Sequence, residues 1–203
     1  GPIQRNDLLA FHKHYYNARR AVVSIIGDVT RAEAERIAQS LTEALPAGLP
    51  DAPPPTIKLP ASEVIKVAHP ASQSHIHVGL PAIQRDDPDY YSLLLGNYSL
   101  GGGGFVSRLM KEVREKRGYA YSVYSYFAPR KLAGPFQIGL QTKRAQAGEA
   151  LKLTHEILAE FVKSGPTEAE LAAAKKNMID GFGLRIDSNA KLLGYLSMIG
   201  FYK

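Results

Sequence analysis

Beyond residue 60 of this 203-residue sequence, the patterns that predict β-strands come in pairs, and helix patterns separate the pairs. Strands are predicted over residues 63–68 and 73–80, and again over 119–127 and 134–142, with the turn of the second pair at residues 129–131. Strands that arrive in hairpins, rather than alternating singly with helices, favour an antiparallel sheet. The sequence therefore predicts an α+β fold in which helices pack on one face of an antiparallel sheet.

Helix signals surround these strand pairs. Asp87-Pro88 is a typical helix start, and Gly118 is a typical helix end. Thr167 with Glu170 forms a capping box, in which each residue satisfies a backbone N–H of the other. The predicted helices of this part of the chain cover residues 87–99, 105–116, 148–162, 167–185 and 189–202.

The first 48 residues carry a shorter series of helix, strand and helix. Residues 7–16 have apolar side chains at helical spacing, and residues 20–27 form an apolar run typical of a strand covered on both faces. Thr30 with Glu33 then forms a capping box at the start of a second helix. A single strand and its helices are too small to fold alone, so we expect this series to be the tail of a larger preceding domain.

A proline-rich stretch separates that tail from the rest. Residues 49–60 hold five of the thirteen prolines, which excludes a helix or a central strand and predicts a semi-rigid connector. We therefore expect residues 1–48 to end one domain, residues 49–60 to be a linker, and residues 61–203 to form a second domain that is cut short at its C-terminus.

Composition excludes several classes of function. The chain has no cysteine, so disulfides and thiolate metal sites are absent, and this suits any compartment. No apolar run approaches the ~18–20 residues of a membrane span. The net charge of +6 is spread along the chain and mixed with acidic residues, without a block of like charges. We therefore expect no nucleic-acid partner and no membrane span.

The most unusual segment runs from residue 100 to residue 126 and begins with four glycines. A phosphate-binding P-loop needs Lys-Ser or Lys-Thr after its last glycine, whereas Phe105-Val106 follows here. A dinucleotide site needs a preceding strand, and a helix is predicted instead. The glycines are predicted to form either a tight turn between helices or a mobile rim that a peptide backbone approaches: Gly101, Gly102, Gly103 and Gly104.

The sequence lacks the common motifs for metal binding and for nucleophilic catalysis. His75 and His77 share one face of a predicted strand, but zinc needs further ligands, and neither His-x-x-Glu-His nor His-Glu-x-x-His occurs in the chain. A Gly-x-Ser-x-Gly nucleophile turn is also missing. The sequence therefore predicts no metal ligand in this chain. We expect these two histidines to be polar residues on one face of a sheet.

Arg114 and Tyr121 lie seven residues apart, across the junction between a predicted helix and a predicted strand. An arginine can hold a carbonyl or carboxylate with two hydrogen bonds, and a tyrosine hydroxyl can donate to a developing oxyanion. The alternative is purely structural, because cations suit helix C-termini and tyrosines suit strands. Strand alternation places Tyr121 on one face with Tyr119, Val123, Ser125 and Phe127, and Ala120, Ser122, Tyr124 and Tyr126 on the other.

The segment LGGGGFVSRLMKEVREKRGYAYSVYSY resembles the second homologous domain of the pitrilysin/insulinase, or inverzincin, zinc metallopeptidases. The similar features are the glycines, Ser-Arg-Leu, Arg-Glu-Lys-Arg-Gly and a Tyr-Ser-Val strand. LLAFHKHYYNARRAVVSIIGDV resembles the end of the first homologous domain of that family, and GPTEAELAAAKKNMIDGF resembles a later helix. The resemblance covers essentially the whole chain.

The resemblance implies two similar α+β domains that enclose a chamber, with zinc on one wall only. The zinc ligands of the family, His-x-x-Glu-His and a distal Glu, belong to the first domain and are missing here. An arginine and a tyrosine on the opposite wall correspond to Arg114 and Tyr121, which implies that these residues bind the substrate main chain and stabilise the tetrahedral intermediate. Tyr119 falls where the family often has leucine, and no such role is carried over to it.

The resemblance therefore implies the substrate-binding, non-zinc half of a zinc endopeptidase that acts on peptides or small unfolded proteins. The peptide would bind partly as an added strand along a sheet edge. The implied partner is a zinc-bearing homologous domain or subunit, in a homodimer or heterodimer, and this chain alone is expected to bind no cofactor and to be inactive. The alternatives are an inactive scaffolding or assembly module, and a module that captures peptides without cleaving them.

Overall fold

The computed structural model of the protein describes residues 2–48 and 55–202, which divide into two compact units. One unit comprises residues 56–181, and the other comprises the described residues before 56 and after 181. The boundary near residue 55 falls inside the predicted linker, of which residues 49–54 lie outside the described part. Residues 55–60 form neither helix nor strand. The assignment of these parts to two homologous domains stays a prediction.

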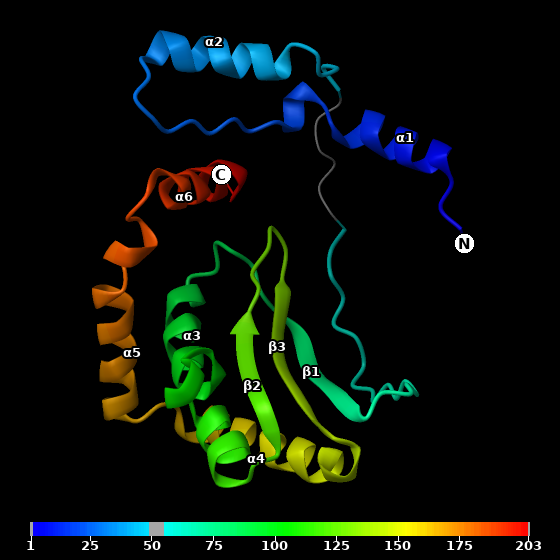
Figure 1. The fold of residues 1–203 in the computed structure, drawn as a ribbon, viewed down its shortest axis with the longest axis vertical. Coiled ribbons are helices and arrows are strands. Elements are labelled where there is room, and N and C mark those ends of the chain that lie inside the picture. The colour runs from blue at the N-terminus through cyan, green and yellow to red at the C-terminus, as the bar shows by residue number, and fades with distance from the viewer. Residues whose placement is uncertain (1, 49–54, 203) are drawn as a thin grey trace. The chain divides into compact units, whose positions relative to one another are not determined.

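The unit of residues 56–181 is built on a three-stranded antiparallel sheet (Figure 1). The strand order is β1-β3-β2, so the central strand β3 (Gly134–Lys143) pairs with both β1 (Gln73–Ile83) and β2 (Ala120–Phe127). Consecutive strands β2 and β3 form the predicted hairpin. The antiparallel sheet predicted from the strand pairs is thereby confirmed.

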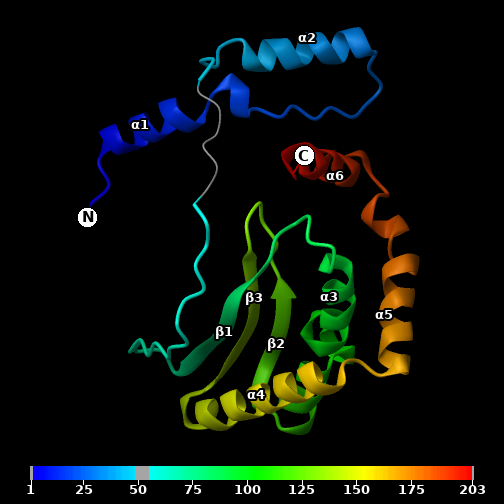
Figure 2. The ribbon, with the colours of Figure 1, turned by 180° about the vertical axis from the view of Figure 1, so that it is seen from behind.

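The two faces of this sheet differ because side chains alternate along each strand. On one face, Phe136, Ile138 and Leu140 of β3 are buried in a core with Val113 and Val123. Helix α4 (Ala147–Ser164) packs on that core, and it crosses in front of the sheet in Figure 2 and behind it in Figure 1. The opposite face, called the open face below, carries exposed or half-exposed polar side chains: His75, His77, Tyr124, Gln137 and Gln141. The prediction of helices on one face is confirmed.

The helices between β1 and β2 begin later than predicted, and parts of them are π-helical, with i→i+5 hydrogen bonds and a wider winding than an α-helix. Helix α3 (Tyr90–Asn97) begins three residues after Asp87, because residues 87–90 form a turn. In this turn the Asp87 carbonyl accepts from the Tyr90 N–H, and the Asp87 carboxylate accepts from the Asp89 N–H. A π-helical turn, Tyr98–Gly102, follows. The next helix covers residues 108–116, and its part Met110–Lys116 is also π-helical.

Helix α5 (Glu168–Asp180) opens with the predicted capping box, in which the Glu170 N–H donates to Thr167 Oγ1 at 3.2 Å. It ends at Asp180, five residues before the predicted end. Gly181 and Gly183 follow, and glycine costs about 1 kcal/mol more than alanine inside a helix. The weak helix-forming tendency of this stretch explains the earlier end.

The other unit contains α1 (Arg5–Tyr15), α2 (Arg31–Thr42) and α6 (Asn189–Tyr202). The predicted capping box of α2 is confirmed, since the Thr30 N–H donates to Glu33 Oε2 at 2.8 Å. Among the residues that the structure describes, no helix is both long and apolar enough to cross a membrane.

Two predicted strands do not form. Residues 63–68 have no regular structure, and Val64, Ile65 and Val67 are exposed. Residues 21–26, in the predicted strand 20–27, are also irregular, and their valines are partly exposed rather than covered on both faces. A strand exists only where another strand satisfies its backbone groups, and no described strand pairs with either segment. A high β-propensity is therefore insufficient here.

Candidate functional site

The junction between residues 108–116 and β2 brings Arg114 and Tyr121 together. Gly118, with a φ of +61°, turns the chain directly from helix into strand. The Gly118 N–H donates to the Arg114 carbonyl, and the Tyr119 N–H donates to the Val113 carbonyl, both at 2.9 Å. The guanidinium carbon of Arg114 consequently lies 4.8 Å from the ring centre of Tyr121.

A bulge in β2 decides where Tyr121 points. Ala120 lies opposite Thr142 and Val123 lies opposite Leu140, so three steps on β2 match two steps on β3. The extra residue shifts the alternation, which is the defining effect of a β-bulge. Tyr121 is 84% exposed, whereas Val123 is 2% exposed.

The prediction that Tyr121 shares a face with Val123 was therefore wrong, as was the placing of Ala120 with Tyr124, because strict alternation does not hold across a bulge. Beyond the bulge the prediction holds. Ser125 is buried on the face of Val123, and Tyr124 and Tyr126 are exposed on the other. Tyr119 packs against the core, in keeping with its having no assigned role.

Arg114 is half-buried, and its guanidinium group lies over two aromatic rings. Its guanidinium carbon lies 4.5 Å from the ring centre of Phe105 as well as 4.8 Å from that of Tyr121. Such cation–π contacts hold the planar group in place without using its N–H donors. Within the described ranges no carboxylate forms an ion pair with Arg114, so its donors are available to a ligand.

Gly101 and Gly102 end the π-helical turn, Gly104 begins a short 3-10 turn, and of the four glycines Gly101 is the one that packs against β2. A side chain on the buried Gly101 would place its Cβ 2.4 Å from Ser125 Oγ and 2.6 Å from Ser125 N. Gly104 is the one of the four with a positive φ, at +61°. The positive φ of Gly104 suits a tight turn, and the close approach at Gly101 is made by β2, while the approach of a peptide backbone to these glycines stays a prediction.

Sequence reasoning missed a second arginine, Arg108. Its Nε and Nη2 donate to the two carboxylate oxygens of Glu170 at 2.8 and 2.6 Å, and Nη2 also donates to the Gly165 carbonyl. These hydrogen bonds from Arg108 lower the pKa of Glu170 to about 2, against the opposing effect of burial, and Thr167 adds to the lowering. Glu170 was recognised only as a capping residue, and nothing local to either residue predicts a pair 62 positions apart.

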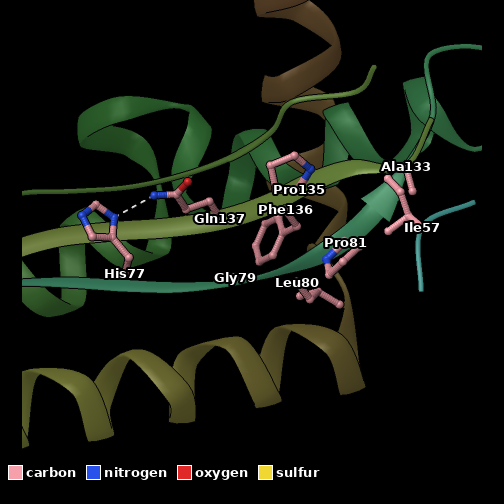
Figure 3. A pocket seen from close by; sticks show the side chains of 9 residues that line it. All are labelled: Ile57, His77, Gly79, Leu80, Pro81, Ala133, Pro135, Phe136 and Gln137. Atoms are coloured by element: carbon pink, nitrogen blue, oxygen red, sulfur yellow. Dashed lines mark hydrogen bonds between the residues drawn. The ribbon is translucent and has the colours of Figure 1, made fainter. Parts of the chain in front are cut away.

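Hydrogen bonds also cross the open face from strand to strand. The Tyr126 hydroxyl donates to Gln137 Oε1 at 2.9 Å, and Gln137 Nε2 lies 2.7 Å from His77 Nδ1. A hollow of about 400 Å³ lies at this end of the sheet, and Figure 3 shows His77 and Gln137 at one end of it and Ile57 and Ala133 at the other. A smaller hollow of about 150 Å³ adjoins Tyr121.

The described histidine and carboxylate side chains are not arranged to hold a zinc ion. Across the part of the chain that the structure describes, no three histidine, aspartate or glutamate side chains are grouped so that they could hold a metal. His75 and His77 share the open face as predicted, but Gln137 is the neighbour of His77 instead of a third ligand.

A sequence family and a solved structure both show similarity to the same domain. The family described as "Peptidase M16 inactive domain" matches residues 2–178. A crystal structure of a peptidase M16 inactive domain from Pseudomonas fluorescens superposes with a TM-score of 0.90 and 42% identity, covering 99% of this chain and 48% of that one.

Two curated relatives add to this picture. An uncharacterized zinc protease of Streptomyces coelicolor is 33% identical over 172 residues, which cover 81% of this chain and 37% of that protein. A Helicobacter pylori protein named a non-peptidase homolog is 40% identical over 84 residues, which cover 41% of this chain and 19% of that protein. The chain thus spans less than half the length of these relatives.

Proposed function

Because this chain belongs to the peptidase M16 family, as its inactive domain, we propose that it forms the substrate-binding, non-zinc half of a zinc endopeptidase chamber. The membership confirms the family resemblance seen in the sequence. The proposed partner is a zinc-bearing homologous domain or subunit, and the proposed substrate is a peptide or a small unfolded protein. The chain by itself would be inactive.

The contact between Arg114 and Tyr121 is the observation that supports this proposal most strongly. A guanidinium stacked on two rings has its direction set, while its N–H groups stay available. Arg114 would donate two hydrogen bonds to a main-chain carbonyl of the substrate. The exposed Tyr121 hydroxyl would donate to the oxyanion that forms when water attacks the scissile carbonyl.

Activation of that water is the chemistry that zinc supplies on the partner wall. The side chains of this chain would act as preorganised donors on the other side of the bound peptide. Donors already in place cost no reorganisation during the reaction, and this is the main reason such groups accelerate acyl transfer. Arg114 orients the ground state, and Tyr121 acts as the oxyanion charge develops.

The edge of the sheet offers a way to hold the peptide main chain. Strand β1 pairs only with β3 among the described strands, so its outer N–H and C=O groups are available for an added strand. The larger hollow spans β1 and its neighbour β3 and is lined mainly by apolar side chains, among them Leu80, Pro81 and Phe136 (Figure 3). An extended peptide along β1 would place an apolar side chain there.

The test is cleavage of a fluorogenic peptide by this chain assembled with a zinc-bearing homologous domain or subunit. Tyr121→Phe removes one hydroxyl and is expected to lower kcat about 10²–10³-fold, the usual cost of one oxyanion donor. Tyr91→Phe, at another exposed tyrosine on α3, is the matched control and should leave kcat unchanged.

Equal turnover of the Tyr121→Phe and unmodified assemblies would overturn the assignment. Absence of cleavage with every zinc-bearing homologue, despite stable assembly, would favour an assembly or peptide-capture module instead. The name of the Helicobacter pylori relative, a non-peptidase homolog, makes this second outcome worth measuring.

A further inference from the structure

We infer that the smaller hollow beside Tyr121 is a subsite for an acidic side chain of the bound peptide, and this inference rests on the proposed function. The hollow measures about 150 Å³, roughly five times the ~30 Å³ that a water molecule occupies in the liquid. That volume suits one side chain of moderate size. The residues that line it are Gln73, His75, His77, Tyr121, Ser122, Tyr124, Leu140 and Gln141.

The register of the sheet explains why these residues meet. The bulge places Tyr121 and Ser122 opposite Gln141, between the pairs Ala120–Thr142 and Val123–Leu140. Gln141 in turn pairs with His75 of β1. One row of polar side chains therefore crosses all three strands at the level of Tyr121, and the bulge is what adds Tyr121 to that row.

The chemistry of the lining favours an anion. None of the eight lining residues is acidic, and all but Leu140 carry at least one group that can donate a hydrogen bond. A carboxylate accepts about four hydrogen bonds and needs several donors when it leaves water. The hydroxyls, amides and imidazoles on this face can supply them.

His75 is the lining residue best placed to supply such a donor. The ring of His77 already meets Gln137, at 2.7 Å from Nδ1. His75 is exposed, and its ring forms no hydrogen bond with the residues that the structure describes. A donor without a partner inside a hollow free of carboxylates is suited to bind an incoming carboxylate.

The position of this hollow links it to the proposed chemistry. One side of the Tyr121 ring faces Arg114, while Tyr121 also lines the hollow. A peptide whose carbonyl is held by Arg114 would therefore place a nearby side chain in the hollow. Arg114 adds positive charge to this neighbourhood, which further favours a carboxylate over a lysine.

The test measures binding of uncleavable, dye-labelled peptides to the chain assembled with its zinc-bearing partner, by fluorescence anisotropy. The peptides have a reduced scissile bond and differ only in carrying Glu, Gln or Lys, scanned through successive positions. At one position Glu should bind roughly tenfold tighter than Lys and several-fold tighter than Gln, as expected for one charge-assisted hydrogen-bonded contact.

His75→Glu should reverse the order, so that the Lys peptide binds tighter than the Glu peptide. The matched control is His155→Glu, at a histidine that is also exposed and lies on α4, the helix that packs against the other face of the sheet. It should leave the order unchanged. If His75→Glu fails to fold, as judged by circular dichroism, His75→Gln replaces it and should reduce the Glu-to-Lys ratio about threefold.

Equal binding of the Glu and Gln peptides at every position would overturn the inference. An unchanged order in His75→Glu, or an unchanged Glu-to-Lys ratio in His75→Gln, would do so as well. These results are separable from the cleavage test of Tyr121. Loss of turnover in Tyr121→Phe with no preference for Glu would leave the proposed function standing and remove only the subsite. A reversed order of the Glu and Lys peptides in His75→Glu, together with unchanged turnover in Tyr121→Phe, would keep the subsite and overturn the assigned role of Tyr121.

Discussion

Arg108 and Arg114 lie six residues apart on one helical segment, and their guanidinium groups have different partners. Both guanidinium groups stack on aromatic rings, Arg108 on Phe161 at 5.0 Å and Arg114 on Phe105 and Tyr121 at 4.5 and 4.8 Å. Arg108 also has a bidentate carboxylate partner, whereas no described carboxylate pairs with Arg114.

The difference lies in the use of the N–H donors. Those of Arg108 are bound to Glu170 and to the Gly165 carbonyl, so the residue ties its helix to the end of α4 and the start of α5. Those of Arg114 are left for a ligand, while the rings fix the orientation of the group. A stacked arginine without an acid is therefore the better candidate for binding, and a stacked arginine with an acid stabilises the fold.

The largest expected effect tests Arg114. Arg114→Ala should lower kcat/KM of the assembled peptidase about 10²–10³-fold, similar to the removal of one charge-stabilising donor, while the unfolding midpoint changes little. Steady-state cleavage and thermal unfolding measure the two quantities. Arg117→Ala, at the exposed end of the same helix, is the control and should change neither. A loss of stability equal to that of an Arg108 variant would show that the two arginines share a structural role.

The next effect tests Arg108. Arg108→Ala leaves the Glu170 carboxylate, 24% exposed, without its partner, and should cost about 2 kcal/mol of folding free energy. That corresponds to a drop of roughly 4–8 °C in the unfolding midpoint, measured by calorimetry. Arg31→Ala removes the much more exposed pair with Glu35 and should shift the midpoint by less than about 2 °C. Similar shifts in both variants would contradict a special role for Arg108.

The smallest effect concerns pH. Arg108 lowers the pKa of Glu170 in the folded chain to about 2, from an ordinary value of 4.5. A lowered folded-state pKa stabilises the fold fully above about pH 4.5, and the contribution is lost as pH falls from there towards 2. After allowance for solvent screening this amounts to about 1–2 kcal/mol.

Glu170→Gln should therefore have a lower free energy of unfolding than the unmodified chain at pH 7. The difference between the two free energies should disappear as pH falls from 4.5 towards 2. Urea unfolding at a series of pH values measures it. Glu35→Gln, at the much more exposed pair of α2, serves as the comparison and should lower the free energy of unfolding at pH 7 by less than Glu170→Gln does. A gap for Glu170→Gln that stays constant down to pH 2 would show that Glu170 is not the titrating group.

Local patterns predicted much of this fold correctly. Both capping boxes form at Thr30 and Thr167, and the hairpin of β2 and β3 forms where it was expected. The predicted strands at residues 20–27 and 63–68 fail to form although both are rich in apolar, β-branched residues. Capping depends on residues three positions apart, whereas a strand depends on a partner elsewhere in space, and propensity does not specify that partner.

The candidate site shows the same division. The sequence by itself determined that Arg114 and Tyr121 flank a helix–strand junction, because Gly118 and the strand pattern are local signals. Only the tertiary structure decided that Tyr121 is exposed beside the open face and that Arg108 binds Glu170. A bulge depends on the register between two strands, and an ion pair depends on the packing of two helices. Both are set by contacts between residues far apart in the chain, which no spacing within a short segment records.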